Sequence, residues 1–237
     1  MKARTKAPPA TGLLLALTLS YQAALAQNPP TIDTLPALKI LPVASSHGNF
    51  TQQRSLPGLA KPLESSGEFY FDQQIGFLWY TTSPVTQAQF FGPKQSYNYI
   101  FSDTATADDT TSKPIKAEKV RTSATRHIAK IIHGIINNDW QQLERIFDAE
   151  VVNNDSTQTV TLNPKNSKLQ KYLLAITLET SQRLLYYRIE MSSGETVRVD
   201  FNNVEENTNN LFESCATSNR SLLQICRHIK TLTQKAP

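Results

Sequence analysis

The chain has 237 residues, a formal net charge of +4 and two cysteines. This length is enough for one domain with a sizeable core. Three of the positive charges lie among the first six residues, so the rest of the chain is nearly neutral. Without a basic surface the composition does not favour nucleic-acid binding.

The first 26 residues have the three parts of an export signal. Lys2, Arg4 and Lys6 are positive, residues 13–19 form a short apolar run, and Ala24-Leu25-Ala26 is a cleavage site. The apolar run is well below the roughly 20 residues that span a bilayer. We therefore expect cleavage after Ala26 and a periplasmic location, with a retained membrane anchor as the alternative.

Cys215 and Cys226 both lie near the C-terminus. In an exported protein such a pair predicts a disulfide bond, whose short loop would add about 2–3 kcal/mol. Because the nearest histidine, His228, could supply only a third ligand, we expect no metal site.

In chain order, residues 27–47 are predicted to be a lead-in with one short helical piece between Thr31 and Pro42. From Gly48 to Phe101 the hydrophobic pattern has a period of two, interrupted by Gly, Pro and Ser turns. The strands expected there are residues 49–53, 68–71, 77–82, 87–91 and 97–101. Their short spacing favours an antiparallel meander.

Residues 102–119 are polar and are predicted to be a mobile loop. In residues 123–147 the apolar side chains have the spacing of a helix. Ile128, Ile131 and Ile135 share one face, and Trp140 and Leu143 begin a second apolar stripe that ends at Ile146 and Phe147.

Strands are predicted again at residues 158–162, 172–180, 184–191 and 196–201, and a helix at residues 221–232. The main domain is therefore predicted at residues 48–204, followed by a C-terminal extension at 205–237. An antiparallel sheet must cover its apolar face, and the helical insert is the expected cover. The fold class is α+β, mainly β.

The first block of strands is unusually aromatic. An acyl chain gains about 0.8 kcal/mol for each methylene removed from water, so a curved sheet lined by rings could hold one. The alternative is that the rings fill an ordinary core.

Four short motifs follow one another along the first block of strands: Phe50-Thr51-Gln52, Ser66-Gly67-Glu68-Phe69-Tyr70-Phe71, Gly76-Phe77-Leu78-Trp79 and Ser83-Pro84. Together they resemble the opening of the LolA outer-membrane lipoprotein carrier family. Leu162-Asn163-Pro164-Lys165 and the run from Arg198 to Asn203 are similar to its closing strands. The resemblance implies an incomplete, curved antiparallel β-barrel (a half-barrel) closed by a helical lid.

The resemblance also implies a function. The chain would be a monomeric periplasmic carrier that takes lipoprotein or lipid cargo from an inner-membrane donor complex to an outer-membrane acceptor. The residues expected to line its lipid-binding cavity are Phe69, Phe71, Phe77, Trp79, Phe90, Tyr97, Tyr99, Ile128, Ile131, Ile135, Trp140 and Leu143.

One position departs from the family pattern. The lipoprotein carriers place an arginine after the strand of Phe69 and Phe71, where it ties the lid shut, and Gln73 stands at this lid-clamp position. Glutamine offers fewer and weaker hydrogen bonds. This difference favours a diverged relative over the housekeeping lipoprotein carrier.

Catalytic motifs are missing from the sequence. It has no G-x-S-x-G elbow and no glycine-rich phosphate loop, and His127 and His133 fall on different sides of a helix. We therefore expect neither an enzyme nor a cofactor. The alternative function is a periplasmic scaffold or adaptor of a lipid-export or lipid-biosynthesis system, with a filled core that binds no ligand.

Overall fold

The structure, a computed structural model, describes residues 43–101, 115–120, 131, 134, 135, 139–207 and 220–234. The predicted signal segment, the helical piece of the lead-in, Ile128 and Cys215 lie outside the described residues. The same holds for most of the first half of the helical region predicted at residues 123–147.

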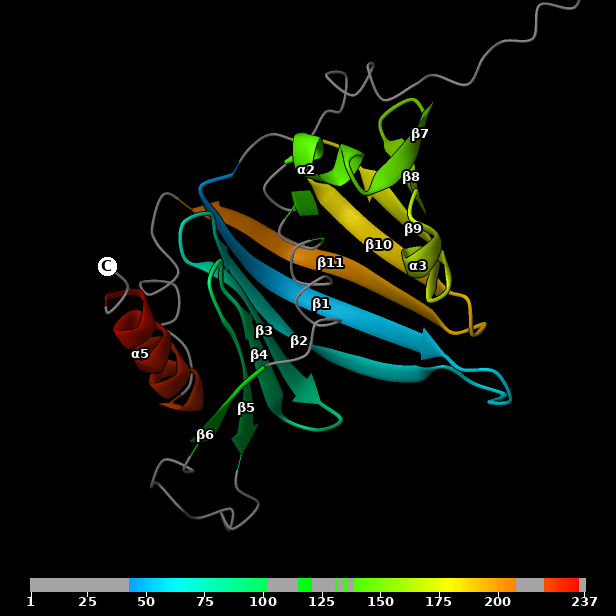
Figure 1. Cartoon of the computed structure of the whole chain (residues 1–237). Coiled ribbons are helices and arrows are strands. Elements are labelled where there is room, and N and C mark those ends of the chain that lie inside the picture. Colours follow the sequence, from blue (N-terminus) through cyan, green and yellow to red (C-terminus); the bar gives the residue numbers. More distant parts are fainter. Residues whose placement is uncertain are drawn as a thin grey trace, which may run out of the picture.

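The described residues form an 11-stranded sheet in the order β6-β5-β4-β3-β2-β1-β11-β10-β9-β8-β7, with neighbouring strands antiparallel. The strands are β1 (Ser45–Ser55), β2 (Leu63–Asp72), β3 (Gly76–Ser83), β4 (Gln87–Phe91), β5 (Ser96–Phe101), β6 (Ile115–Lys119), β7 (Phe147–Asn153), β8 (Gln158–Pro164), β9 (Leu173–Thr180), β10 (Leu184–Met191) and β11 (Thr196–Asn207). Described helices are α2 (Trp140–Glu144), α3 (Ser167–Gln170) and α5 (Arg220–Gln234). The sheet is strongly curved and does not close into a barrel (Figure 1).

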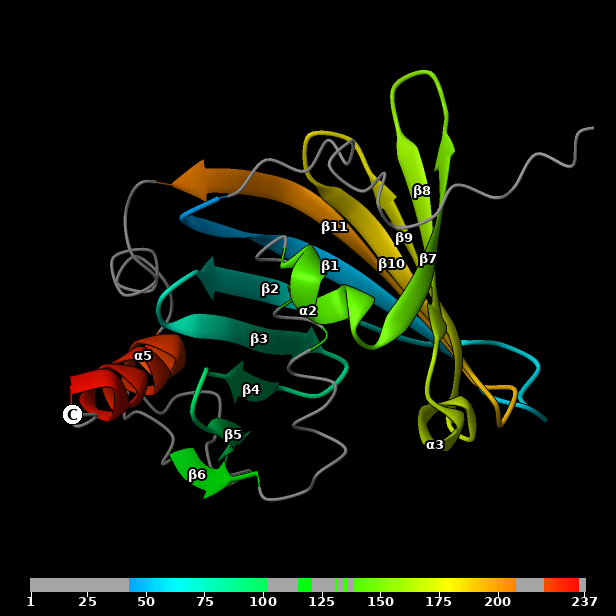
Figure 2. The same cartoon turned by 45° about the horizontal axis from the view of Figure 1, so that its top comes forward.

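Both faces of the sheet are covered. Figures 1 and 2 show α2 within the arc of the sheet and α5 outside it. On the inner face, one cluster is built on the aromatic residues of β1–β3 and a second joins Leu143 of α2 to β7–β9. On the outer face, Leu222, Ile225 and Ile229 of α5 pack against β2–β5. The C-terminal extension is therefore part of the core.

Glycine permits a close approach at the centre of the aromatic strands. A Cβ atom on Gly67 would lie 2.0 Å from the carbonyl oxygen of Tyr80. The backbone of β3 therefore leaves no space for a side chain at this position, which lies opposite Phe50 on β1. The rings of Phe50 and Trp79 stack with centroids 3.7 Å apart.

The predicted mainly β half-barrel is confirmed, with several corrections to its elements. The loop prediction for residues 102–119 is wrong at its end, because β6 pairs with β5 there. The helical prediction is wrong at Phe147, which begins β7 and pairs with Pro164. β6 has few apolar residues, so its pairing with β5 fixes it and its own pattern does not. In β7, by contrast, Phe147, Ala149 and Val151 alternate with Asp148 and Glu150, which is a strand pattern.

The cysteine prediction is described only in part. Cys226 lies on the buried side of α5 and is disulfide-bonded. Its predicted partner, Cys215, is not among the described residues.

Candidate functional site

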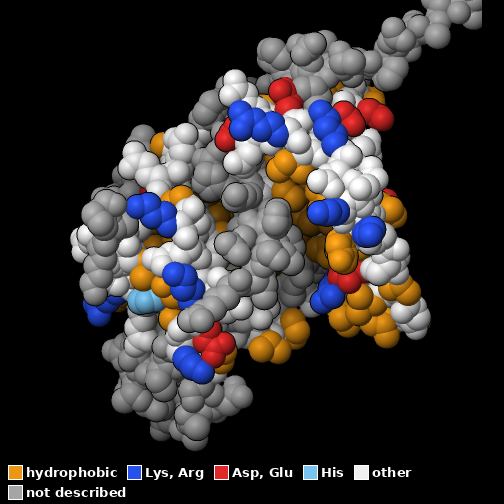
Figure 3. All heavy atoms as spheres, in the orientation of Figure 1, with side chains coloured by type: hydrophobic (Ala, Val, Ile, Leu, Met, Phe, Trp, Pro, Cys, Tyr) orange, Lys and Arg blue, Asp and Glu red, His pale blue; other side chains and the backbone are white. Residues whose placement is uncertain are grey.

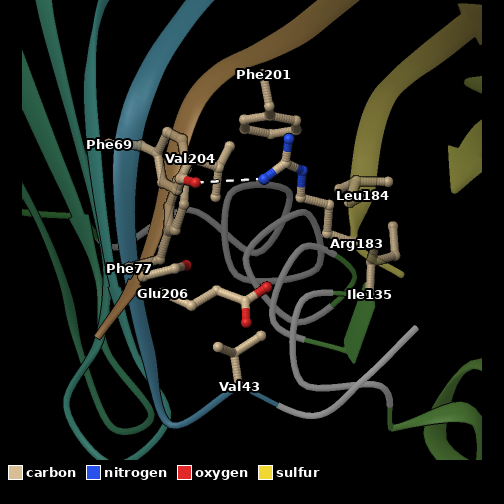
Figure 4. A pocket seen from close by; sticks show the side chains of 10 residues that line it. Val43, Phe69, Phe77, Ile135, Arg183, Leu184, Phe201, Val204 and Glu206 are labelled. Carbon is tan, nitrogen blue, oxygen red and sulfur yellow. Dashed lines mark hydrogen bonds between the residues drawn. The ribbon is translucent and has the colours of Figure 1, made fainter. Parts of the chain in front are cut away.

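A small cavity lies on the inner face of the sheet (Figure 4). Its volume is about 60 Å³, and its lining is mostly apolar. The residues that line it are Val43, Ser46, Phe69, Phe77, Ile135, Arg183, Leu184, Phe201, Val204 and Glu206.

Strand alternation and register bring the aromatic wall together. Phe69 and Phe77 lie on neighbouring strands β2 and β3 and point to the same face, their ring centroids 6.1 Å apart. Phe201 reaches this wall because β11 pairs with β1 and places it opposite Phe50. The rings of Phe69 and Phe201 meet edge to face at 5.1 Å, an arrangement that aromatic pairs favour.

The polar groups of the cavity gather where the pairing of β10 and β11 ends. The last pair in this direction is Tyr186 with Asp200, and β11 continues beyond it to Asn207. Arg183, in the turn before β10, reaches across and donates a hydrogen bond of 3.3 Å to the carbonyl oxygen of Val204 (Figure 4). Its guanidinium and the carboxylate of Glu206 are both on exposed residues.

Eight of the twelve predicted lining residues lie on the inner face, in three groups. Phe69, Phe77 and Ile135 line the cavity itself. Phe71 and Trp79 belong to the same aromatic cluster as Phe69 and Phe77, but they do not line the cavity. The three remaining described helical residues, Ile131, Trp140 and Leu143, pack further along the inner face, against β7–β9.

Phe90, Tyr97 and Tyr99 correct the prediction of one shared cavity. They lie on the outer face of the sheet and pack against α5. The Tyr99 hydroxyl and Nδ1 of His228 on α5 are hydrogen-bonded at 3.1 Å. The physical reason is alternation: on β3 the residues Leu78 and Tyr80 point away from Phe77, and β4 and β5 place these three rings on that side.

Gln73 does not clamp anything over the cavity in the described structure. It is exposed in the turn between β2 and β3, and its backbone N–H donates to the carbonyl oxygen of Ala44. Arg183 instead supplies the arginine next to the cavity, from the opposite side. Arg183, Leu184 and Phe201 also line the cavity but were not predicted from the sequence. The alternation of Val197, Val199 and Phe201 was the available signal for Phe201.

The cavity is small compared with known ligand sites. A site for one water needs about 10–15 Å³, whereas pockets for drug-sized ligands measure about 300–1,000 Å³. The rings of the adjoining aromatic cluster pack closely, as the contact of Phe50 with Trp79 shows. The cavity would therefore have to widen to admit a whole acyl chain.

An antiparallel sheet curved around an apolar inner face, but left open along one side, defines the class of half-barrel proteins with helices inside the arc. Residues 42–214 match the family described as outer membrane lipoprotein carrier protein LolA. The chain belongs to the LolA family, and the resemblance noted in its motifs is confirmed.

Several solved structures are similar to this chain at low sequence identity. A MucA/MucB complex from Pseudomonas aeruginosa has 11% identity and a TM-score of 0.41, covering 75% of this chain and 56% of that chain. A LolA superfamily protein from Nitrosomonas europaea has 14% identity and a TM-score of 0.37, covering 76% and 92%. A protein from Desulfovibrio piger has 13% identity and a TM-score of 0.38, covering 77% and 92%. No curated protein matches the chain.

Within the residues that the structure describes, none of the helices has the length and apolar character to cross a bilayer. Within the same residues, no group of three or more His, Cys, Asp or Glu side chains is placed to hold a metal ion.

Proposed function

We propose that this protein is a periplasmic carrier that binds acyl chains of a lipoprotein or lipid and delivers them towards the outer membrane. Membership of the LolA family supports this function. Carriers of this family are generally not enzymes, which agrees with the lack of catalytic motifs in the sequence.

The observation that carries the proposal is the apolar wall of the cavity. Phe69, Phe77 and Phe201 face Ile135 and Leu184 across it, so a hydrocarbon chain that widened the cavity would meet apolar groups on both sides. Each methylene removed from water there would contribute about 0.8 kcal/mol. The donor at the inner membrane and the acceptor at the outer membrane would then compete with the cavity for the chain.

Native mass spectrometry of protein purified from the periplasm tests this function. We expect a bound mass that organic extraction removes and that an added fatty acid or lipopeptide restores. Ile135→Phe should weaken this binding, because the larger side chain fills the cavity. The matched control is Ile225→Phe, the same change at a buried position of α5 on the outer face.

Equal binding by both variants, or an empty wild-type protein that takes up neither ligand, would contradict carriage. The second outcome would favour a periplasmic scaffold or adaptor. The close packing of Phe50 on Trp79 is the observation that supports this second function, because it leaves little space on the inner face.

A further inference from the structure

Exposed apolar side chains gather at one end of the sheet. Among the described residues seven large hydrophobic side chains are exposed, and five of these lie at the turns of this end. We call these five the apolar rim: Leu59, Leu63, Val85, Tyr172 and Leu174, with exposed fractions from 51% to 68%.

Two of the three turns that carry the apolar rim, β1–β2 and α3–β9, are linked through the β10–β11 hairpin. The β1–β2 hairpin touches the β10–β11 hairpin, since a Cβ on Gly194 would lie 3.2 Å from Cγ of Pro57. The backbone N–H of Ser192, in the β10–β11 hairpin, donates to the carbonyl oxygen of Tyr172. Figures 1 and 2 both place these two hairpins and α3 together at the lower right.

Lysines stand among these apolar side chains. Lys61 lies between Leu59 and Leu63, and Lys168 and Lys171 precede Tyr172. All three lysines are exposed, and none of the ion pairs found among the described residues engages them.

Nearby carboxylates cancel only part of this charge. Glu195 of the β10–β11 turn is paired with Arg54 at 2.6 Å. Glu64 accepts a hydrogen bond from the side-chain amide of Gln53, which carries no charge, so the negative charge of Glu64 remains and offsets one lysine. Three lysines less this one carboxylate leave the rim with two net positive charges.

We propose that the apolar rim docks on the surface of an anionic lipid bilayer. Leucine and valine can enter the boundary of the acyl chains, and tyrosine is favoured at the level of the head groups. Lysines beside them are attracted electrostatically to anionic lipids, which strengthens binding. Figure 3 shows hydrophobic side chains in separate patches along the lower edge and lower right, with Lys and Arg between them.

This arrangement fits a lipid surface better than a protein partner. A stable protein interface buries about 800 Å² on each side in a well-packed patch. The members of the rim instead project from separate turns, so each can enter a fluid surface independently. Binding to a bilayer does not require these side chains to form one surface of complementary shape.

Docking by this end sets the orientation of the carrier. The cavity lies at the other end of β1, beside Ser46, whereas the rim begins after Ser55. At about 3.3 Å per residue the strand separates them by about 30 Å. The cavity would thus stay clear of the lipid and open to a partner while the protein stands on the membrane. Docking does not depend on whether the cavity binds an acyl chain.

Co-sedimentation with vesicles tests the proposal, using the exported protein. We expect binding to phosphatidylglycerol mixed with phosphatidylcholine, weakened by salt, and much less binding to phosphatidylcholine alone. Replacing Lys61, Lys168 and Lys171 by Gln should lower the affinity about five-fold for each lysine, roughly 100-fold in all. The control removes the same charge elsewhere, by Lys94→Gln, Lys119→Gln and Lys230→Gln, and should change binding far less.

Apolar insertion is tested by the pair Leu59→Ser and Tyr172→Ser, which should weaken binding by about ten-fold or more. The control is Val152→Ser, an exposed apolar position beside the β7–β8 hairpin at the opposite end of the sheet. All three side chains are exposed, so circular dichroism and melting temperature should stay unchanged.

Three results would overturn the proposal: no binding of the wild-type protein to anionic vesicles, equal binding to phosphatidylcholine alone, or equal losses in the rim and control variants. If the rim variants lost an acidic protein partner but bound vesicles normally, the rim would be a protein-docking surface, and the assignment to lipid would be wrong.

Discussion

Truncating neighbouring residues of β3 should separate ligand binding from general stability. Phe77 and Leu78 are both almost fully buried, but Phe77 lines the inner cavity and Leu78 packs on the outer face against α5. Truncation of a buried Phe costs about 3–5 kcal/mol and of a buried Leu about 2–5 kcal/mol. Without ligand we therefore expect Phe77→Ala and Leu78→Ala to destabilise the protein to a similar extent.

A bound acyl chain should then distinguish the two variants. Phe77→Ala enlarges the existing cavity, and each extra methylene admitted adds about 0.8 kcal/mol. Two or three methylenes would increase affinity for a fatty acid by roughly 30-fold, a gain of about 2 kcal/mol. Leu78→Ala opens space on the other side of the sheet, so its gain from ligand should equal that of the wild-type protein.

Urea unfolding followed by circular dichroism, with and without fatty acid below its micelle concentration, measures both effects. Ligand at about 100 times its dissociation constant raises the free energy of unfolding by about 2.7 kcal/mol. Phe77→Leu, which loses less volume, replaces the alanine variant if that variant does not fold. The reasoning is refuted if Leu78→Ala gains as much from the ligand as Phe77→Ala, or if neither gains more than the wild-type protein.

Three other predictions concern the edges of the core. Arg183→Ala removes the hydrogen bond to Val204, worth about 0.5–1.5 kcal/mol, so a fluorescent fatty acid should dissociate up to about ten-fold faster in stopped-flow measurements; an unchanged rate would count against a role for Arg183 at the cavity. Cys226→Ser should lower the free energy of urea unfolding by about 3 kcal/mol if the bond closes the short loop to the only other cysteine; reducing the wild-type protein should have the same effect. Burial lowers the pKa of His228, so the unfolded chain binds more protons in mild acid. The stability that this shift contributes is present above the unfolded pKa of about 6.5 and is lost as the pH falls from there through the lowered pKa. In urea unfolding measured across this pH range, the free energy of unfolding of His228→Gln should fall less than that of the wild-type protein. An equal fall with pH in both proteins would show that the histidine is not involved.

The architecture could be predicted because strand alternation and turn residues are local signals. The turns at Pro57-Gly58 and at Ser192-Ser193-Gly194 connect paired strands as expected, and Gly58 and Gly194 have positive φ angles of 88° and 84°. Those angles are accessible to glycine at little cost. The order of the motifs indicated the family, and the family implied the curved half-barrel into which these strands assemble.

The sequence also holds a signal for burial of both faces, which a period of two does not describe. Phe69-Tyr70-Phe71 and Phe77-Leu78-Trp79-Tyr80 are continuous apolar runs, and such runs indicate strands that are buried on both sides. Assigning all the aromatic residues to one cavity therefore placed Phe90, Tyr97 and Tyr99 on the wrong side. The amphipathic pattern of Leu222, Ile225 and Ile229 on the final helix was the matching signal for an outer cover.

The position of Arg183 could not be found from its local sequence. It follows two polar residues in a turn, where an exposed arginine is ordinary. Its place beside the cavity depends on where the pairing of β10 with β11 ends, and that register is set by contacts far apart in the chain.

Because the cavity must widen to take an acyl chain, the weaker of its two walls should give way. The wall of Phe69 and Phe77 lies on strands paired on both sides and is backed by α5 through the outer cluster. Moving it would disturb several ring pairs, each worth about 0.5–1.5 kcal/mol beyond the area they bury. The opposite wall includes Arg183, which is exposed and holds β11 by one hydrogen bond of 3.3 Å. Since a typical hydrogen bond contributes only about 0.5–1.5 kcal/mol in total, we expect the turn before β10 to yield first and the aromatic wall to keep its shape.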